Sequence, residues 1–321
     1  MRSSTYVDPA AGQQTVEAYL EAWREQQAHH RPGTAASTRT RFRTMVYPYL
    51  GATPLASVMP STVRTWQADL LRAGYSPSTV KGVRGQVAGA FLDAIRDRIL
   101  TGSPFDGVKA PEVVSEEIVP LTVGQVRAGE RATPDRYRAL ITLVAGTGVR
   151  ASEAWGLTRD RVDLEAATVR VNRQLTGRRG PEPVFGPPKS RAGVRTVPLP
   201  RHVVDALGKH LADYPAEPGE LVFRTARGTP LTRTVWGKAW RPAAGGGPAE
   251  AMGLTRGEGL HQLRHFYASL LIAAGRSPRE VQERLGHATL EETLRTYVHL
   301  WHAADEGTRD AVDRAFDETP E

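Results

Sequence analysis

Four short segments in the second half of the sequence hold side chains that together could act on a phosphate ester. They run Thr147-Gly-Val-Arg-Ala-Ser-Glu, Pro187-Pro-Lys-Ser-Arg-Ala-Gly-Val-Arg-Thr-Val-Pro-Leu-Pro, His261-Gln-Leu-Arg-His, and Leu285-Gly-His followed by Leu-Arg-Thr-Tyr-Val-His. The candidate residues in these segments are Arg150, Lys189, His261, Arg264, His287 and Tyr297.

These residue types match what attack on a phosphodiester needs. Two guanidinium groups can each hold a pair of phosphate oxygens and offset the charge that grows during the reaction. A tyrosine can form a covalent intermediate, although a phenol with a pKa of about 10 needs help to ionise. Histidine and a lysine of shifted pKa can accept and donate the protons. This chemistry requires no metal ion or cofactor, and the sequence shows no convincing carboxylate cluster to hold a metal.

In this order and spacing the six residues resemble the catalytic set of the tyrosine site-specific recombinases, the family of the phage integrases and the Xer enzymes. The resemblance covers essentially the whole chain and is densest from residue 147 to residue 300. It implies that Arg150 and Arg264 hold the scissile phosphate and that Tyr297 attacks it to form a 3′-phosphotyrosine.

The same resemblance implies roles for the remaining members of the set. Lys189 would protonate the leaving 5′ hydroxyl, His261 would act as acid and base toward the nucleophile, and His287 would donate to a phosphate oxygen. Glu153 matches a supporting acidic position that helps to hold the site. The covalent link would conserve the bond energy, so that no ATP is needed, and exchange of the second strand would form a Holliday junction.

Residues 12–105 are expected to form the first domain, after a short extension over 1–11. Apolar residues recur there at helical spacing, and Ser76 followed by Pro77 is a helix-start signal for a helix that runs to about Leu100. The expected fold is an all-helical, four-helix, SAM-like core-binding domain. Within a mainly α protein, this domain would precede the catalytic domain.

The linker predicted over residues 106–119 rests on the glycines and prolines in and beside this stretch, which are Gly102, Pro104, Gly107, Pro111 and Pro120. The following residues 120–321 are expected to form a mixed, mostly helical catalytic domain with a small antiparallel β-sheet and a C-terminal tail. The alternation in 168–172 and 194–199 predicts strands, with Lys189 in the turn before the second. The Gly/Pro-rich stretch 242–259 is predicted to be a surface loop.

The charge balance is basic, with 42 Lys and Arg residues against 35 Asp and Glu residues and a net charge of +7, which points only weakly to nucleic acid. The absence of cysteine excludes disulfides and thiol catalysis. The resemblance makes the first domain half of a clamp around the DNA duplex. The candidates for phosphate contacts are Arg39, Arg41, Arg43, Lys81 and Arg84, with an ordinary solvated basic face as the alternative for each.

The expected partner is double-stranded DNA that carries specific recombination sites. The resemblance implies a homotetramer on synapsed sites, while free in solution a monomer fits equally well, and it allows an accessory DNA-bending or directionality factor. No signal peptide or membrane span is visible, so a cytoplasmic, nucleoid-associated protein is expected. Integrases of this type often carry an extra amino-terminal domain that binds separate arm sites on the DNA, and such a domain is either lacking here or lies ahead of this sequence. The acidic end, 303–321, could supply a helix that is exchanged between subunits.

Several other functions are compatible with parts of this pattern. Integration or excision of a mobile element is favoured over an Xer-like resolvase, and both over a type IB topoisomerase-like enzyme. A catalytically decayed DNA-binding protein would not need all six positions filled. His261 and His265 also resemble a zinc-hydrolase pair, but Gln262 stands where that motif places its catalytic glutamate.

Overall fold

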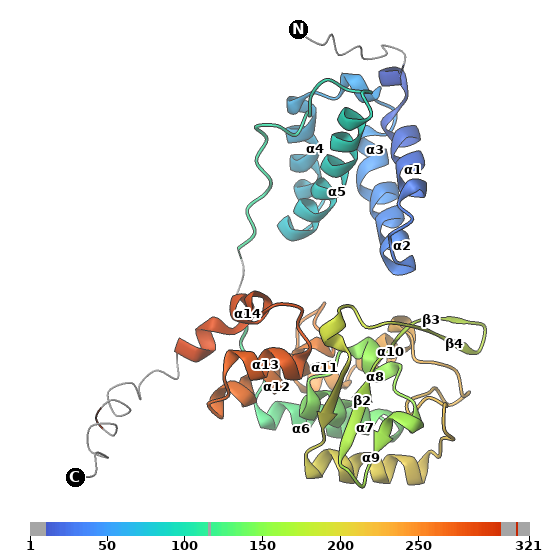
Figure 1. Cartoon of the computed structure of the whole chain (residues 1–321), viewed down its shortest axis with the longest axis vertical. Coiled ribbons are helices and arrows are strands. Elements are labelled where there is room, and N and C mark those ends of the chain that lie inside the picture. Colours follow the sequence, from blue (N-terminus) through green and yellow to red (C-terminus); the bar gives the residue numbers. More distant parts are fainter. Residues whose placement is uncertain (1–10, 115–116, 303–312, 314–321) are drawn as a thin grey trace. The chain divides into compact units, whose positions relative to one another are not determined.

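The computed structural model describes residues 11–114, 117–302 and 313, and the chain divides into two compact units, Met1–Ser115 and Glu116–Glu321 (Figure 1). Each unit has its own hydrophobic core. The expectations for residues 1–10, and for an exchanged helix within 303–321, fall outside the described residues except at Asp313.

The first unit contains four helical segments, as predicted. Its longest helix, α5, begins at Pro77, where the Ser76 hydroxyl accepts the backbone N–H of Thr79 at 3.3 Å. It ends earlier than predicted because Arg98 takes a positive φ of 59°. The segments are α1 (Val16–Gln26), a continuous run of α2 (Pro32–Arg41), a π-helical stretch (Phe42–Val46) and α3 (Tyr47–Leu50), α4 (Pro60–Arg72) and α5 (Pro77–Arg96).

Two buried aromatic side chains tie these helices together through their polar ends. The indole N–H of Trp66 on α4 donates to the carbonyl of Met45 at 2.7 Å. The hydroxyl of Tyr19 on α1 donates to the carbonyl of Ala90 on α5 at 3.0 Å. Because each ring buries a large apolar area and still satisfies its donor, the first unit has a well-specified core.

The second unit is mostly helical, as predicted. Helix α7 is buried along most of its length and packs against α9 and α12. The helices are α6 (Val123–Ala132), α7 (Asp135–Thr147), α8 (Ala151–Trp155), α9 (Arg201–Asp213), α10 (Arg233–Trp240), α11 (Pro248–Ala251), α12 (His261–Ala273), α13 (Pro278–Leu285) and α14 (Leu290–His302). Short 3₁₀ turns cover Ala11–Gln13 and Leu55–Ser57 in the first unit, and Arg159–Arg161 and Arg191–Gly193 in the second.

A small antiparallel sheet of three strands accompanies these helices in the order β1-β2-β5, with β1 over Val162–Asp163, β2 over Thr168–Val171 and β5 over Arg195–Pro198. The chain between β2 and β5 forms a further hairpin of β3 (Gln174–Arg179) and β4 (Glu182–Gly186), which extends away from β2 (Figure 1). The sequence predicts strands only at 168–172 and 194–199, because a hairpin with little buried surface shows no apolar alternation.

The stretch 242–259 is only partly a surface loop, so that prediction was wrong for its centre. It contains the short helix α11, and Ala249 and Met252 are fully buried in the core of the unit. Met252 lies so close to α6 that a Cβ on Gly129 would stand 1.9 Å from the methionine Cε. Proline and glycine set the local turns here, but tertiary packing decides the burial. Among the described residues, no helix is long and apolar enough to cross a membrane.

Candidate active site

The turn between α7 and α8 places Arg150. Gly148 ends α7 with a φ of 64°, in the left-handed region that favours glycine. A Cβ at Gly148 would also stand 2.4 Å from Cδ1 of Tyr267, so no larger residue fits without a shift. Two residues later, Arg150 stands at the start of α8 with its side chain directed to the end of α13, where its Nη2 donates to the carbonyl of Gly286 at 3.0 Å.

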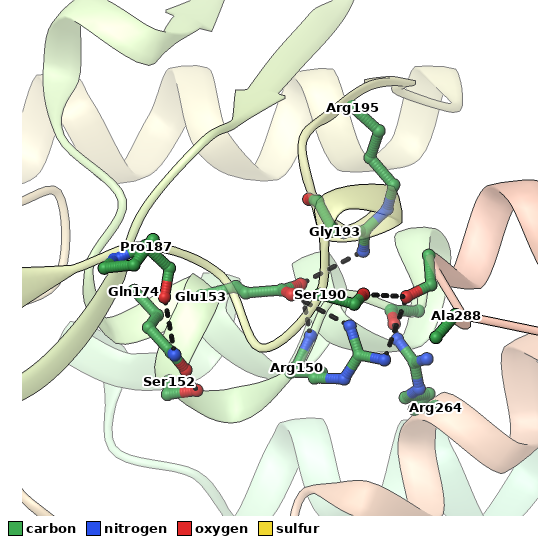
Figure 2. Close-up of polar contacts among 12 residues, drawn as sticks. Arg150, Ser152, Glu153, Gln174, Pro187, Ser190, Gly193, Arg195, Arg264 and Ala288 are labelled. Carbon is green, nitrogen blue, oxygen red and sulfur yellow. Dashed lines mark hydrogen bonds and ion pairs between the residues drawn. The ribbon is translucent and has the colours of Figure 1, made fainter. Parts of the chain in front are cut away.

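Glu153 is the buried anion behind this arginine. Its side chain is only 1% exposed, and its carboxylate accepts from Nη1 of Arg150 at 3.1 Å and from the Arg150 backbone N–H at 3.0 Å. It also accepts from Nη2 of Arg195 at 3.0 Å (Figure 2). Glu153 was predicted as a supporting residue, and the structure places it against Arg150.

Arg195 is a member of this network that the sequence analysis did not single out. From β5 it reaches Glu153 on α8, and its Nε donates to the carbonyl of Arg284 near the end of α13 at 2.9 Å. It therefore joins three elements that carry the site. Arg195 lies within the Lys189 segment, but its carboxylate partner is 42 residues away, so no local spacing could have revealed the pair.

The pKa of Glu153 gives a test of this network. Burial by itself would raise that pKa, but the charge and hydrogen bond of Arg195, followed by Arg150, hold it below the ordinary value of 4.5. A depressed pKa in the folded chain means that the ionised form adds stability above pH 4.5, and that this stability is lost as the pH falls through the folded pKa.

We therefore expect Glu153→Gln to lower the free energy of unfolding by about 3 kcal/mol at pH 7, because it leaves two guanidinium groups around a neutral amide. The difference from wild type should shrink as the pH falls below 4.5. Chemical denaturation at several pH values measures it. Glu283→Gln, which removes an exposed ion pair with Arg279, is the matched control and should cost at most about 1 kcal/mol at any pH. An equal loss for Glu153→Gln at pH 7 and pH 3 would contradict this account.

A second glycine turn, at Gly286, lies against the segment that carries Lys189. Gly286 ends α13 with a φ of 66°, and a Cβ on it would stand 2.9 Å from the carbonyl oxygen of Ala192. Its own carbonyl oxygen accepts from Arg150 and lies 3.5 Å from the hydroxyl of Ser190. Lys189, the neighbour of that serine, is exposed in the loop between β4 and β5.

Arg264 is the most deeply buried cation of the set. On α12 it is 1% exposed, and its Nη1 donates to the carbonyl of Gly148 at 2.6 Å. Its Nε and Nη2 atoms are buried and have no hydrogen-bond partner among the described residues. Burial, and then the charges of Arg150 and Arg195, lower the pKa of Arg264 to about 9. Figure 2 shows its side chain beside that of Arg150, so the site carries positive charge that Glu153 offsets only in part.

His261 and His287 flank the two arginines as neutral rings. His261 begins α12 and keeps an exposed edge, while the desolvation of its other side and then the charges of Arg264, Arg150 and Lys189 lower its pKa to about 4. His287 is buried, and desolvation followed by the same two arginines lowers its pKa to about 3. The effect of Lys189 on His261 shows that this lysine lies within electrostatic reach of the site.

The orientation of His287 is fixed by its neighbours on the same stretch of chain. Its Nδ1 lies 2.8 Å from the hydroxyl of Thr293, and its backbone carbonyl accepts from the side chain of Gln282 at 3.3 Å. If the threonine hydroxyl donates to Nδ1, the proton of the neutral ring stands on Nε2 and is available as a hydrogen-bond donor.

Tyr297 lies on α14, within the same group of side chains. It is 1% exposed, and its ring stacks on that of His287 with centroids 6.5 Å apart and planes 10° apart. Its hydroxyl lies 2.8 Å from Nδ1 of His265, a residue that the sequence analysis considered only as a zinc ligand. Burial raises the pKa of Tyr297 to about 12, against the opposing effect of Arg264. The phenol is therefore protonated in the chain without DNA.

The structure thus brings together five of the predicted residues, Arg150, His261, Arg264, His287 and Tyr297, with Glu153, and adds Arg195 and His265. Lys189 lies on the neighbouring exposed loop. The rings of His261 and His265 are 4.6 Å apart and nearly perpendicular. In the part of the chain that is described, no group of three or more His, Cys, Asp or Glu side chains is placed to hold a metal ion. Two arginines, neutral histidines and a buried phenol define a cationic site that can hold an anion beside a tyrosine hydroxyl.

Known proteins resemble this chain in sequence and in fold. The model of a family described as the phage integrase family matches residues 125–303. The integrase of Mycobacterium phage FRAT1 is 29% identical over 288 residues, which cover 87% of this chain and 82% of that protein. The tyrosine recombinase XerD of Mycobacterium leprae is 34% identical over 202 residues, 59% of this chain and 57% of that one.

The fold is similar to that of the integrase of transposon Tn1549, solved in complex with a circular intermediate DNA. The TM-score is 0.79 at 24% identity, with 94% of this chain and 99% of that chain covered. The family match and the sequence relatives show that the chain is an enzyme of the tyrosine recombinase class. It belongs to the phage integrase family, which confirms the family, the fold class and the site-specific recombinase function predicted from the sequence.

Proposed function

We propose that the protein cleaves and rejoins DNA through a covalent 3′-phosphotyrosine at Tyr297 while it integrates or excises a mobile element. One observation carries this proposal: two nitrogens of the buried Arg264 guanidinium, Nε and Nη2, have no hydrogen-bond partner among the described residues, in the group of side chains that includes Tyr297. A buried charged donor without an acceptor is costly, so such a group persists where a ligand completes it. A phosphate oxygen is an acceptor of the right charge.

In this proposal Arg150 and Arg264 hold the phosphate, and the protein fixes the guanidinium of Arg150 at more points than that of Arg264. Arg150 is fixed by Glu153 and by the carbonyl of Gly286, so its guanidinium cannot turn away. Arg264 is fixed at one nitrogen by the carbonyl of Gly148 and offers its Nε and Nη2. Because these donors are oriented before DNA binds, they cost little reorganisation when charge develops on the phosphate oxygens.

The protons would be moved by the remaining side chains. Lys189, on the exposed loop before β5, would protonate the leaving 5′ oxygen, and His261 would serve as acid and base on the nucleophile side. His287 would donate from Nε2 to a phosphate oxygen, because its Nδ1 is held by Thr293. The guanidinium groups supply the positive charge and the phosphotyrosine conserves the bond energy, so we expect the reaction to need neither a metal ion nor ATP.

The first unit would contact the DNA backbone through α2 and α5. These helices pack together, and a Cβ on Gly82 of α5 would stand 3.9 Å from Nη1 of Arg41 on α2. Lys81 is exposed at the start of α5, Arg39 is exposed on α2, and Arg43 is exposed on the π-helical stretch that follows α2. Four basic side chains are therefore candidates for phosphate contacts: Arg39, Arg41, Arg43 and Lys81.

Arg84, the fifth candidate, differs from these four because it makes contacts within the first unit. Its Nη2 donates to the carbonyl of Val108 at 2.6 Å, and its guanidinium lies 5.3 Å from the centre of the Phe105 ring. It therefore holds residues 105–108 against the helices of the first unit, and this use of its donors leaves less of it for DNA.

We expect Arg41→Ala and Lys81→Ala each to weaken binding to all DNA sequences alike, and to reduce the slope of log affinity against log salt by about 1. Arg84→Ala should instead lower the melting temperature, with a smaller change in the salt slope. Fluorescence anisotropy across a salt series measures the slopes. A full change of slope for Arg84→Ala, together with none for the other two variants, would contradict this assignment.

The proposal is tested with duplexes from around the gene, nicked so that the cleaved state is trapped. We expect a protein–DNA adduct that resists SDS and forms without ATP and in the presence of EDTA. Cross-linking on paired sites should then show a homotetramer. If a DNA-bending or directionality protein is required, strand exchange should occur only when a host extract is added. Sequence-specific binding without adduct would refute the cleavage chemistry.

A further inference from the structure

His265 contacts the reacting atom of the proposed nucleophile. Its Nδ1 lies 2.8 Å from the hydroxyl oxygen of Tyr297, and the two rings meet at 65° with centroids 5.6 Å apart. On its other side, the His265 ring meets the ring of His261, one helical turn earlier on α12. Tyr297, His265 and His261 thus form a continuous series of contacts at the site.

We propose that His265 is a seventh catalytic residue, the group that accepts the phenolic proton of Tyr297 when the tyrosine attacks DNA. The inference rests on the proposed function, in which Tyr297 is the nucleophile. It also changes the part played by His261, which would act on the phosphate side of the site.

The step balances with the groups already described. The O–H bond of Tyr297 breaks and its proton moves to Nδ1 of His265, while the phenolic oxygen bonds to phosphorus. The bond from phosphorus to the 5′ oxygen breaks, and that oxygen takes a proton from Lys189. In rejoining, Lys189 takes a proton from the incoming 5′ hydroxyl and His265 returns its proton to the departing tyrosine, so both side chains regain their starting state.

The geometry favours His265 over His261 for this task. Among the described side chains, Tyr297 has no hydrogen bond to His261, which sits at the exposed start of α12. The charges of Arg264, Arg150 and Lys189 all act on the His261 ring, so it belongs with the phosphate-binding groups. A general base must lie within hydrogen-bond reach of the proton that it removes, and His265 meets that condition before DNA binds.

Electrostatics confine the transfer to the DNA-bound state. In the free chain, burial and the neighbouring His261 and Arg264 lower the pKa of His265 to about 3, while the pKa of Tyr297 is raised to about 12, so the phenol keeps its proton. A phosphodiester held by Arg264 offsets part of this positive charge and raises the pKa of His265. The phenol becomes more acidic as its oxygen bonds to phosphorus, so the proton moves during the attack.

Two substitutions separate proton transfer from simple positioning. His265→Ala removes the contact, whereas His265→Asn keeps an amide close to the position of Nδ1 that can hydrogen-bond the phenol but does not accept its proton. We expect both variants to slow single-turnover cleavage of a nicked duplex by about 100-fold or more, with DNA affinity unchanged. His202→Asn, an exposed histidine on α9, is the matched control and should cleave like wild type.

A substrate with a different leaving group shows whether a variant is defective in activating Tyr297 or in protonating the leaving 5′ oxygen. A duplex with sulfur in place of the bridging 5′ oxygen needs no proton donor to the leaving group, so it should restore cleavage by Lys189→Ala. It should not restore either His265 variant. Thermal melting and DNA binding select the folded variants, and if His265→Ala fails to fold, the asparagine variant carries the test.

The failures of the two proposals are distinct. Wild-type cleavage by His265→Asn would show that a hydrogen bond suffices and would overturn the assignment of His265 as proton acceptor. Rescue of the His265 variants by the sulfur substrate would overturn it as well, since it would place this histidine on the leaving-group side. Absence of adduct with the wild-type protein would refute the proposed function itself.

Discussion

Replacing Tyr297 by phenylalanine is expected to abolish the covalent protein–DNA adduct and to lower cleavage by roughly 10⁵-fold or more, because no other group can take the place of the nucleophile. The fold should tolerate the change. The ring stays in its buried position against His287, and only the hydroxyl contact with His265 is lost, at a cost of about 1 kcal/mol. Denaturing gels of nicked duplexes incubated with both proteins measure the adduct.

The control for this variant is Tyr267→Phe. Tyr267 is also a buried tyrosine, on α12 beside the Gly148 turn, but its hydroxyl has no part in the proposed chemistry. It should keep the adduct and most of the rate. An adduct formed by Tyr297→Phe at a comparable level would contradict the account.

Replacing Arg264 by methionine is expected to separate stability from activity. Cleavage should fall by at least about 10³-fold, because a donor set aimed at the phosphate is lost. The melting temperature should stay unchanged or rise by up to about 4 °C, because a buried guanidinium with two nitrogens that lack a partner in the described part of the chain is replaced by an apolar side chain of similar length. Single-turnover cleavage and thermal denaturation measure the two effects.

Arg138→Met serves as the control for this substitution, since Arg138 makes an exposed ion pair with Asp135 on α7. It should leave both quantities nearly unchanged. A large fall in melting temperature for Arg264→Met would show that this arginine is chiefly structural and would contradict its proposed role in holding the phosphate.

Four of the six predicted residues stand in local patterns, although only the order of all six, with its resemblance to a known family, pointed to their chemical roles. Gly148 and Gly286 mark the turns that end α7 and α13, and Arg150 and His287 follow them within two residues. The helical spacing of His261 and Arg264 places both at the start of α12. Short-range signals of this kind survive without any knowledge of the tertiary fold.

Arg195 and His265 could not be found in the same way, because their roles depend on residues far along the chain. Arg195 meets Glu153 across 42 residues, and His265 meets Tyr297 across 32. The buried helix α11 was missed for a related reason: its burial comes from contacts with α6 and not from its own composition. Sequence patterns predicted the elements and the chemistry, and the tertiary packing determined which side chains touch.

The most direct test of the central claim is to identify the residue that is joined to DNA. Wild-type protein is trapped on a nicked duplex, the DNA and the protein are digested, and the peptide that retains nucleotides is sequenced by mass spectrometry. The account predicts a nucleotide on Tyr297, attached through a 3′ phosphate. A nucleotide on another residue, Tyr267 included, or attachment through a 5′ phosphate, would contradict it.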